Sequence, residues 1–111
     1  MVRNAKRSPS EILARNAAKA EAMLKQLAHA GRLVILCSLT EGEKTVGQLM
    51  QLVDLSQSAV SQHLAKLREA KLVEADKRGQ MVYYRISSDE AQSILSALYQ
   101  IYCKPQHSKN N

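Results

Sequence analysis

A pair of short amphipathic segments joined by a tight turn constrains the fold of this chain most strongly. Thr45 and Gln48 form a capping-box pattern at the start of the first segment. After the turn Asp54–Ser56, Ser56 can cap a second helix that runs to about residue 71. The apolar positions expected to face inward are Val46, Leu49 and Met50 in the first helix and Val60, Leu64 and Leu67 in the second. The sequence therefore predicts two adjacent helices packed across a turn.

A β-hairpin is predicted directly after these two helices. Leu72–Lys77 and Met81–Ile86 are rich in strand-forming residues and flank Arg78-Gly79-Gln80, where Gly79 can supply the turn. Two adjacent helices followed by a hairpin describe a winged helix-turn-helix, in which the second helix can enter the major groove of DNA.

Three further helices are predicted, two before this unit and one after it. One uninterrupted apolar stripe covers Ile12–Leu27, and a second helix carries the run Leu33–Leu39. Ser87 with Glu90 is expected to cap the last helix. The apolar stripe of that helix is Ala91, Ile94, Leu95, Leu98, Ile101 and Tyr102.

The expected fold is mainly α with a β-hairpin wing, in the order α-α-α-α-β-β-α. Residues 10–104 would form one winged helix-turn-helix domain for DNA binding and dimerisation. Residues 1–9 are expected to be a disordered basic tail, and residues 105–111 a flexible C-terminal tail. A core of this size is modest, so a dimer would bury additional surface.

The charge of the chain favours a polyanionic partner. Sixteen Lys and Arg residues against ten Asp and Glu residues give a formal charge of +6, with a pI near 9.6. The absence of Trp and Phe disfavours binding to single strands by stacking, so duplex DNA is the better candidate. No run approaches the roughly 20 apolar residues of a membrane span, and no signal peptide is evident. We therefore expect a cytoplasmic protein with no membrane association.

Polar side chains on the second helix of the central pair are candidates for base and phosphate contacts. They lie opposite or N-terminal to the apolar stripe, and they are Gln57, Ser58, Ser61 and Gln62. A merely solvated polar face is the alternative. His63 fits a structural hydrogen bond at least as well as a base contact. Lys77 and Arg78 at the hairpin could reach phosphates or the minor groove, although a charged hairpin tip is often only hydrated.

These residues resemble the ArsR/SmtB family of bacterial winged-helix repressors. The resemblance rests on Val46-Gly-Gln-Leu49 and above all on Leu55–Val73, which begins Leu-Ser-Gln-Ser-Ala-Val-Ser-Gln-His-Leu. It implies a homodimer joined through the first and last helices, a palindromic operator and release by an inducer. It also implies that Gln57, Ser58, Ser61 and Gln62 occupy DNA-reading positions.

The metal sites of the family are not matched, so no metal or other cofactor is predicted. Thr45 and Gly47 stand where many members carry a Cys-x-Cys pair. Asp89 matches a ligand of the other metal site, on the last helix. The remaining ligand positions of that second site hold Ala91, Tyr102 and Pro105.

Two cysteines remain to be explained. Cys37 lies in an apolar run and Cys103 near the end of the last helix, and both could simply be packed, reduced thiols. The resemblance extends to a subgroup typified by BigR and SqrR, whose paired cysteines sense persulfides and related reactive sulfur. It implies a repressor that binds its operator when reduced and releases it when a disulfide or polysulfide bridge links Cys37 and Cys103.

Other function classes fit the sequence less well. A thiol enzyme would require a base beside the thiolate, and no Cys-x-x-Cys motif or nearby Cys/His arrangement is present, so we expect no enzyme. A nonspecific nucleoid-type protein would share the positive charge without needing the polar helix face. A repressor that responds to metal or to general oxidants remains the closest alternative.

Overall fold

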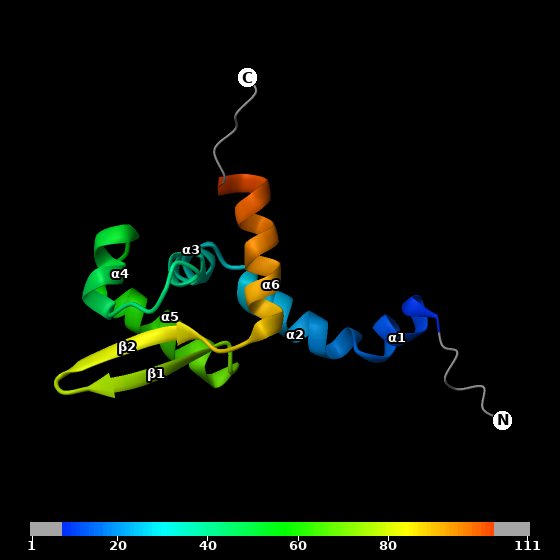
Figure 1. Cartoon of the computed structure of the whole chain (residues 1–111), viewed down its shortest axis with the longest axis horizontal. Helices are drawn as coiled ribbons and strands as arrows, with labels where there is room; N and C mark the ends of the chain where they lie inside the picture. The colour runs from blue at the N-terminus through cyan, green and yellow to red at the C-terminus, as the bar shows by residue number, and fades with distance from the viewer. Residues whose placement is uncertain (1–7, 104–111) are drawn as a thin grey trace, which may run out of the picture.

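The computed structural model describes residues 8–103, which form helices and one β-hairpin in the predicted order (Figure 1). The helices are α1 (Pro9–Arg15), α2 (Ala17–Leu27), α3 (Ala30–Leu39), α4 (Val46–Leu52), α5 (Gln57–Glu69), α6 (Asp89–Leu98) and the π-helical turn η2 (Tyr99–Cys103). The strands are β1 (Val73–Arg78) and β2 (Met81–Ile86). Apart from Ser8 and Pro9, which begin α1, the expected tails at 1–9 and 105–111 lie outside the described residues.

The core lies where α3, α4 and α5 meet the hairpin and the start of α6. Leu49 is fully buried, whereas Met50, predicted to face inward, is 39% exposed. In a seven-residue helix, Leu49 and the partly buried Val46 already occupy the side that faces the core. The largest fully buried side chains are Ile35, Leu36, Leu49, Val60, Leu64, Leu67 and Leu95. The predicted winged helix-turn-helix is thus confirmed.

The wing is a tight antiparallel hairpin. Arg78 pairs with Met81, so only Gly79 and Gln80 form the turn rather than the three residues expected. Gly79 has φ +62°, a left-handed conformation that two-residue hairpin turns require and glycine adopts at little cost. Lys44 in the α3–α4 loop exchanges two backbone hydrogen bonds with Tyr84, of 3.0 and 2.8 Å. The loop is therefore attached to β2.

The prediction of one continuous helix over Ile12–Leu27 was wrong, because Asn16 interrupts it. Asn16 has φ −103° and ψ 8°, and it ends α1. Its side-chain Nδ2 donates to the carbonyl of Ile12 at 3.0 Å. Asparagine competes with helical geometry in this way, which explains the break between α1 and α2.

The predicted cap of the last helix was displaced by one residue. Ser88, not Ser87, caps α6, because its Oγ accepts from the backbone N–H of Ala91 at 3.1 Å. Ser87 is used elsewhere: its backbone N–H donates to Leu72 and its hydroxyl to Lys71. The connection from the wing to α6 is thereby tied to the end of α5.

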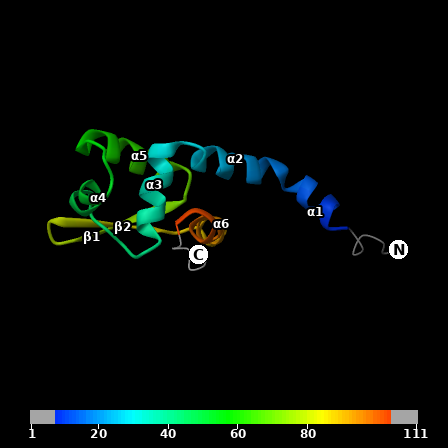
Figure 2. The same ribbon diagram turned by 90° about the horizontal axis from the view of Figure 1, so that it is seen from above.

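Two helical arms project from this body. Figures 1 and 2 both show α1 and α2 extending to one side, and Figure 1 shows α6 rising away from the wing. The Cα radius of gyration is 17.2 Å, whereas a compact domain of this length has about 13 Å. The apolar stripe of α6 continues into η2, where Ile101 is 62% and Tyr102 is 78% exposed. The C-terminal end of the predicted apolar stripe therefore lies on the surface of the single chain.

Candidate nucleic-acid interface and cysteine pair

The N-cap and the buried stripe of α5 determine which of its side chains remain exposed as the predicted reading face. The Ser56 Oγ accepts from the Ala59 backbone N–H at 3.1 Å and starts the helix. Val60, Leu64 and Leu67 turn inward. The side chains left exposed at the N-terminal part of α5 are Gln57, Ser58, Ser61 and Gln62. These amide and hydroxyl groups can donate to and accept from base edges, and the helix N-terminus favours phosphate.

Lys66 extends this face and was missed in the sequence. It follows Gln62 by four residues, is exposed, and therefore lies on the same side of α5. The four-residue spacing from Gln62 was the signal that could have identified it. A cation there can contact phosphate beside the groove.

His63 faces the protein rather than the reading face. Its ring lies edge to face against that of His29, with centroids 4.9 Å apart. A Cβ on Gly31 would lie 2.7 Å from His63 Nε2, so the ring fills the space that this glycine leaves. Burial lowers the pKa of His63, and the charges of His29, Arg32 and Lys66 lower it further. The location fits a structural role for His63, through packing of its ring against His29 and Gly31 rather than through the hydrogen bond expected.

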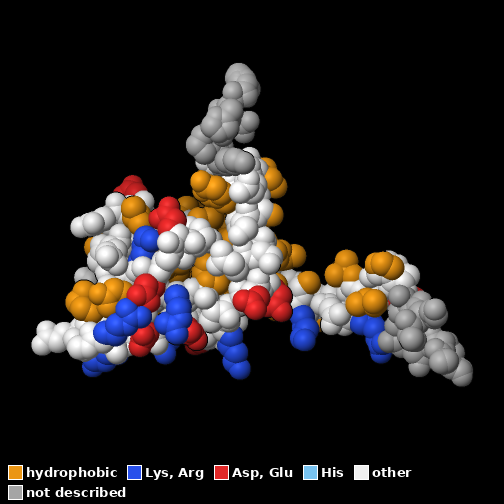
Figure 3. Space-filling view, in the orientation of Figure 1, with side chains coloured by type: hydrophobic (Ala, Val, Ile, Leu, Met, Phe, Trp, Pro, Cys, Tyr) orange, Lys and Arg blue, Asp and Glu red, His pale blue; other side chains and the backbone are white. Residues whose placement is uncertain are grey.

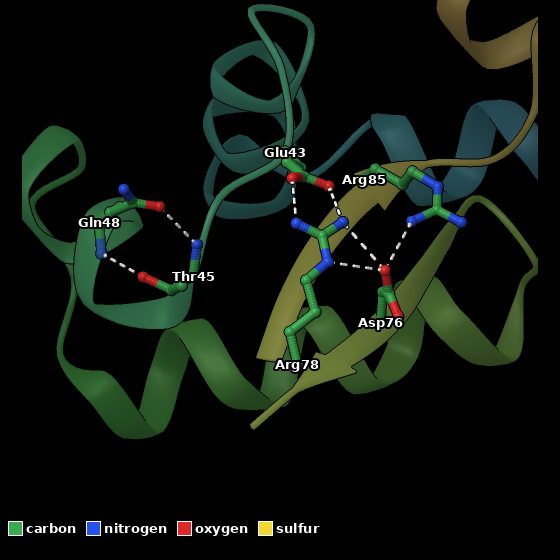
Figure 4. A network of polar contacts seen from close by, with 6 residues as sticks. All are labelled: Glu43, Thr45, Gln48, Asp76, Arg78 and Arg85. Atoms are coloured by element: carbon green, nitrogen blue, oxygen red, sulfur yellow. Dashed lines mark hydrogen bonds and ion pairs between the residues drawn. The ribbon is translucent and has the colours of Figure 1, made fainter. Parts of the chain in front are cut away.

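Lys77 and Arg78 differ sharply in their surroundings, although they are neighbours at the end of β1. Lys77 is exposed. The Arg78 guanidinium donates to Glu43 from Nη1 at 2.6 Å and from Nη2 at 2.7 Å, and its Nε donates to Asp76 at 2.9 Å (Figure 4). It also lies over the Tyr83 ring, 4.6 Å from the centroid. Arg78 is therefore already engaged by protein groups.

These contacts shift the pKa values of Glu43 and Arg78. Hydrogen bonds from Arg78 lower the pKa of Glu43, and those to Glu43 and Asp76 raise the pKa of Arg78. Arg85 Nη1 lies 3.8 Å from the same Asp76 Oδ2 and extends the network across the hairpin (Figure 4). Sequence reasoning missed Glu43, since it lies 35 residues from Arg78 and no local pattern joins them.

The two cysteines are free thiols in different environments. Cys37 is half-buried on α3 and packs against the core, whereas Cys103 is exposed at the end of η2. Burial raises the pKa of Cys37, and negative charge on Cys103 raises it further. The Cys37 thiol therefore ionises less readily than that of a free cysteine would.

Thr45, at one of the two positions where the resemblance places a metal-binding Cys-x-Cys pair, has a structural role here. Thr45 is buried and caps α4: its Oγ1 accepts from Gln48 N–H at 3.1 Å, and its own N–H donates to Gln48 Oε1 at 2.9 Å. Over residues 8–103, no three His, Cys, Asp or Glu side chains come together in a group that could hold a metal ion. Pro105 and His107 lie outside the described residues.

None of the helices within residues 8–103 has the length and apolar character needed to cross a membrane.

The helix pair, its exposed polar face and the adjacent wing define a winged-helix regulator of transcription that binds DNA. Residues 29–75 match the family described as "Bacterial regulatory protein, arsR family". The chain is 46% identical over 90 residues to the transcriptional activator HlyU of Vibrio cholerae, covering 81% of this chain and 83% of that protein. It is 36% identical over 100 residues to the biofilm growth-associated repressor of Agrobacterium fabrum, covering 90% and 86%. This chain belongs to the ArsR family.

Solved structures agree with this assignment. The transcriptional repressor BigR from Xylella fastidiosa superposes with a TM-score of 0.82 at 35% identity, covering 88% of this chain and all of that one. Reduced HlyU from Vibrio cholerae superposes with a TM-score of 0.79 at 44% identity, covering 85% and 99%. Similar regulators thus carry the names of both activators and repressors.

Proposed function

We propose that this protein is a cytoplasmic, homodimeric repressor that binds palindromic operator DNA while its cysteines are reduced. The observation that carries this proposal is the exposed polar face of α5, formed by Gln57, Ser58, Ser61 and Gln62 beside a wing that bears Lys77. The chain also carries the net positive charge that duplex DNA attracts. Relatives named as repressors support the direction of regulation.

The projecting arms support a dimer. The helix α1 has seven residues and buries none of them, and α2 buries only Leu27. Helices this short gain most of their stability from packing, so a second surface must cover them. Exposed apolar side chains gather along both arms (Figure 3), namely Ile12, Leu13, Leu24, Tyr99, Ile101 and Tyr102. Pairing of α1, α2 and α6–η2 with the same elements of a second copy would bury them.

A dimer fixes the form of the operator. A two-fold axis between the arms presents two α5 helices, and such pairs bind half-sites about one helical turn apart. We propose Gln57, Ser58, Ser61 and Gln62 as the reading residues. Lys77 would contact backbone phosphates, and Lys66 would assist from α5. His63 and Arg78 are left out of the contact set, because protein groups already hold their side chains.

The inducer that we propose is a persulfide or related reactive sulfur species. Cys103 is exposed and Cys37 has a raised pKa, so the Cys103 thiolate is expected to react first. It attacks the outer sulfur of a persulfide R–S–SH, which forms Cys103–S–SH and releases the thiolate of R–SH. The Cys37 thiolate then attacks the Cys103 sulfur and expels hydrosulfide, leaving a disulfide. A second donor molecule, reacting at Cys37, would give a trisulfide by the same route.

The bridge would act through α3. This helix carries Cys37 and packs against α5, whereas Cys103 lies at the end of the α6–η2 arm proposed to build the dimer. Linking them would tie the reading helices to the dimer scaffold and change their relative angle or spacing. Two helices that no longer match successive major grooves would lose the operator.

Mass spectrometry combined with operator binding tests the proposal. The reduced protein is exposed separately to a persulfide donor, hydrogen peroxide, oxidised glutathione and zinc. We expect the donor to link Cys37 to Cys103, alone or with added sulfur, and to release DNA. An exposed Cys103 also favours a general oxidant sensor, so equal linkage and release by peroxide would support that alternative. Release by zinc without linkage would contradict the thiol switch.

A further inference from the structure

We call the bidentate ion pair between Glu43 and Arg78 the clamp, and it joins the wing to the body of the protein. Arg78 is the last residue of β1, beside the wing turn, and Glu43 belongs to the α3–α4 loop on the body of the protein. An isolated two-stranded hairpin is only marginally stable in water, so its attachments decide where it points. The attachments from this loop to the wing are the two Lys44–Tyr84 backbone hydrogen bonds and this ion pair.

The geometry of the clamp fixes the orientation of the Arg78 guanidinium in addition to attracting it to Glu43. Two parallel N–H donors meet the two oxygens of Glu43, which fixes the plane of the guanidinium. Asp76 and the Tyr83 ring hold the same group from the hairpin side. Exposed ion pairs add little to global stability, so the effect is expected on the placement of the wing.

We propose that Arg78 is a positioning residue, which binds Glu43 to hold the wing against the α3–α4 loop in its DNA-binding orientation, rather than a phosphate contact. The inference rests on the proposed DNA-binding function. The proposal predicts that Glu43 strengthens DNA binding, although it is an acidic residue near the proposed DNA-binding surface. From charge alone the opposite is expected, because removing a negative charge strengthens the attraction to phosphate.

The test compares charge-neutralising variants at two matched pairs of positions. Glu43→Gln and Glu41→Gln remove the same charge from the same loop, but the Glu41 carboxylate pairs with the Lys44 ammonium at 3.5 Å and, among residues 8–103, not with the wing. Arg78→Gln and Lys77→Gln remove neighbouring cations. We expect Glu43→Gln and Arg78→Gln each to weaken operator binding several-fold, while Glu41→Gln leaves it equal or slightly tighter. Tighter binding by Glu43→Gln would overturn the proposal.

Salt dependence separates positioning from phosphate contact. Losing one phosphate contact lowers the slope of log K against log salt by about 0.9. We expect this change for Lys77→Gln and an unchanged slope for Arg78→Gln. A slope reduced by about 0.9 for Arg78→Gln would show that its guanidinium contacts phosphate, and the proposal would fail.

Amide hydrogen exchange tests the clamp in the free protein. In Glu43→Gln the amides of Lys44 and Tyr84, which hydrogen-bond the loop to β2, should exchange several-fold faster than in the wild type and in Glu41→Gln. Unchanged exchange would overturn the clamp. Because no DNA is present, this measurement decides it even if the wild-type protein binds no operator, a result that would contradict the proposed function alone.

Discussion

His63 Nε2 lies 2.7 Å from the point where a Cβ on Gly31 would stand, so the ring of a residue on α5 occupies the space left by a glycine on α3. Gly31 has no left-handed backbone angle to explain its presence. The close approach of the imidazole explains it instead, and this contact joins the helix that carries Cys37 to the proposed reading helix.

Replacing Gly31 with alanine should therefore destabilise the protein by about 1–3 kcal/mol, through overpacking against His63. In the His63→Ala background the same replacement should stabilise by up to about 1 kcal/mol, because alanine is the better helix former. Urea denaturation of the two single variants and the double variant measures this. Equal effects of Gly31→Ala in both backgrounds would show that the contact does not govern this position.

The pH dependence of stability should include a contribution from His63. Its folded-state pKa is lowered from 6.5 by burial, so the unfolded chain binds a proton more readily. That contribution is full above the unfolded-state pKa and is lost as pH falls through and below 6.5. Unfolding free energies at pH 7.5 and 5.5 should therefore differ more in the wild type than in His63→Gln. An identical difference in both proteins would contradict the lowered pKa.

The proposed dimer should depend on the arms. Leu13→Glu and Tyr102→Glu each place a charge on an exposed apolar arm and should convert the dimer to monomers. Met81→Glu is the control, because Met81 is 50% exposed on the wing, away from both arms. Sedimentation should give twice the 12.3 kDa of one chain for the wild type and control, and 12.3 kDa for the arm variants. A dimeric Tyr102→Glu would exclude η2 from the interface.

If α5 reads the base sequence, substitutions on its exposed face should lower the preference for operator over random DNA. Gln57→Ala and Ser61→Ala should reduce the ratio of operator to random-sequence affinity, by about 1–3 kcal/mol for a bidentate Gln contact. Lys77→Ala should weaken both DNAs alike, because phosphate contacts carry no sequence information. Competition binding with labelled duplexes at fixed salt measures both. If the α5 variants and Lys77→Ala behaved identically, the assignment of the reading face would be wrong.

The proposed redox switch should require both thiols. Cys37→Ser and Cys103→Ser should fold and bind the operator as the reduced wild type does, but they should keep it in the presence of a persulfide donor. In the wild type each 1.4 kcal/mol lost from the complex lowers affinity about tenfold, so a modest rearrangement suffices for release. A thiol reductant should restore binding. Release of either single variant by the donor would eliminate the two-thiol bridge.

Much of the fold could be predicted because its signals are local. The Thr45–Gln48 capping box, the hairpin with Gly79 in its turn and the buried stripe of α5 depend on residues a few positions apart, and all three were predicted and found, although the turn is one residue shorter than expected. The exposed face of α5 followed from that stripe, because helical geometry turns the remaining residues outward. The family motif lies on the same segment, so fold and class were both predictable from sequence.

Tertiary structure alone decided what contacts what across long separations. No spacing in the sequence joins Glu43 to Arg78, or His63 to Gly31, because each pair meets only once separate elements have packed. The cap of α6 is Ser88 rather than the predicted Ser87, because Ser87 donates hydrogen bonds to Lys71 and Leu72 in the segment that follows α5. Local propensity determines which segments become helices and strands. Packing between them determines whether an arginine at the wing is free for DNA or already bound to a carboxylate.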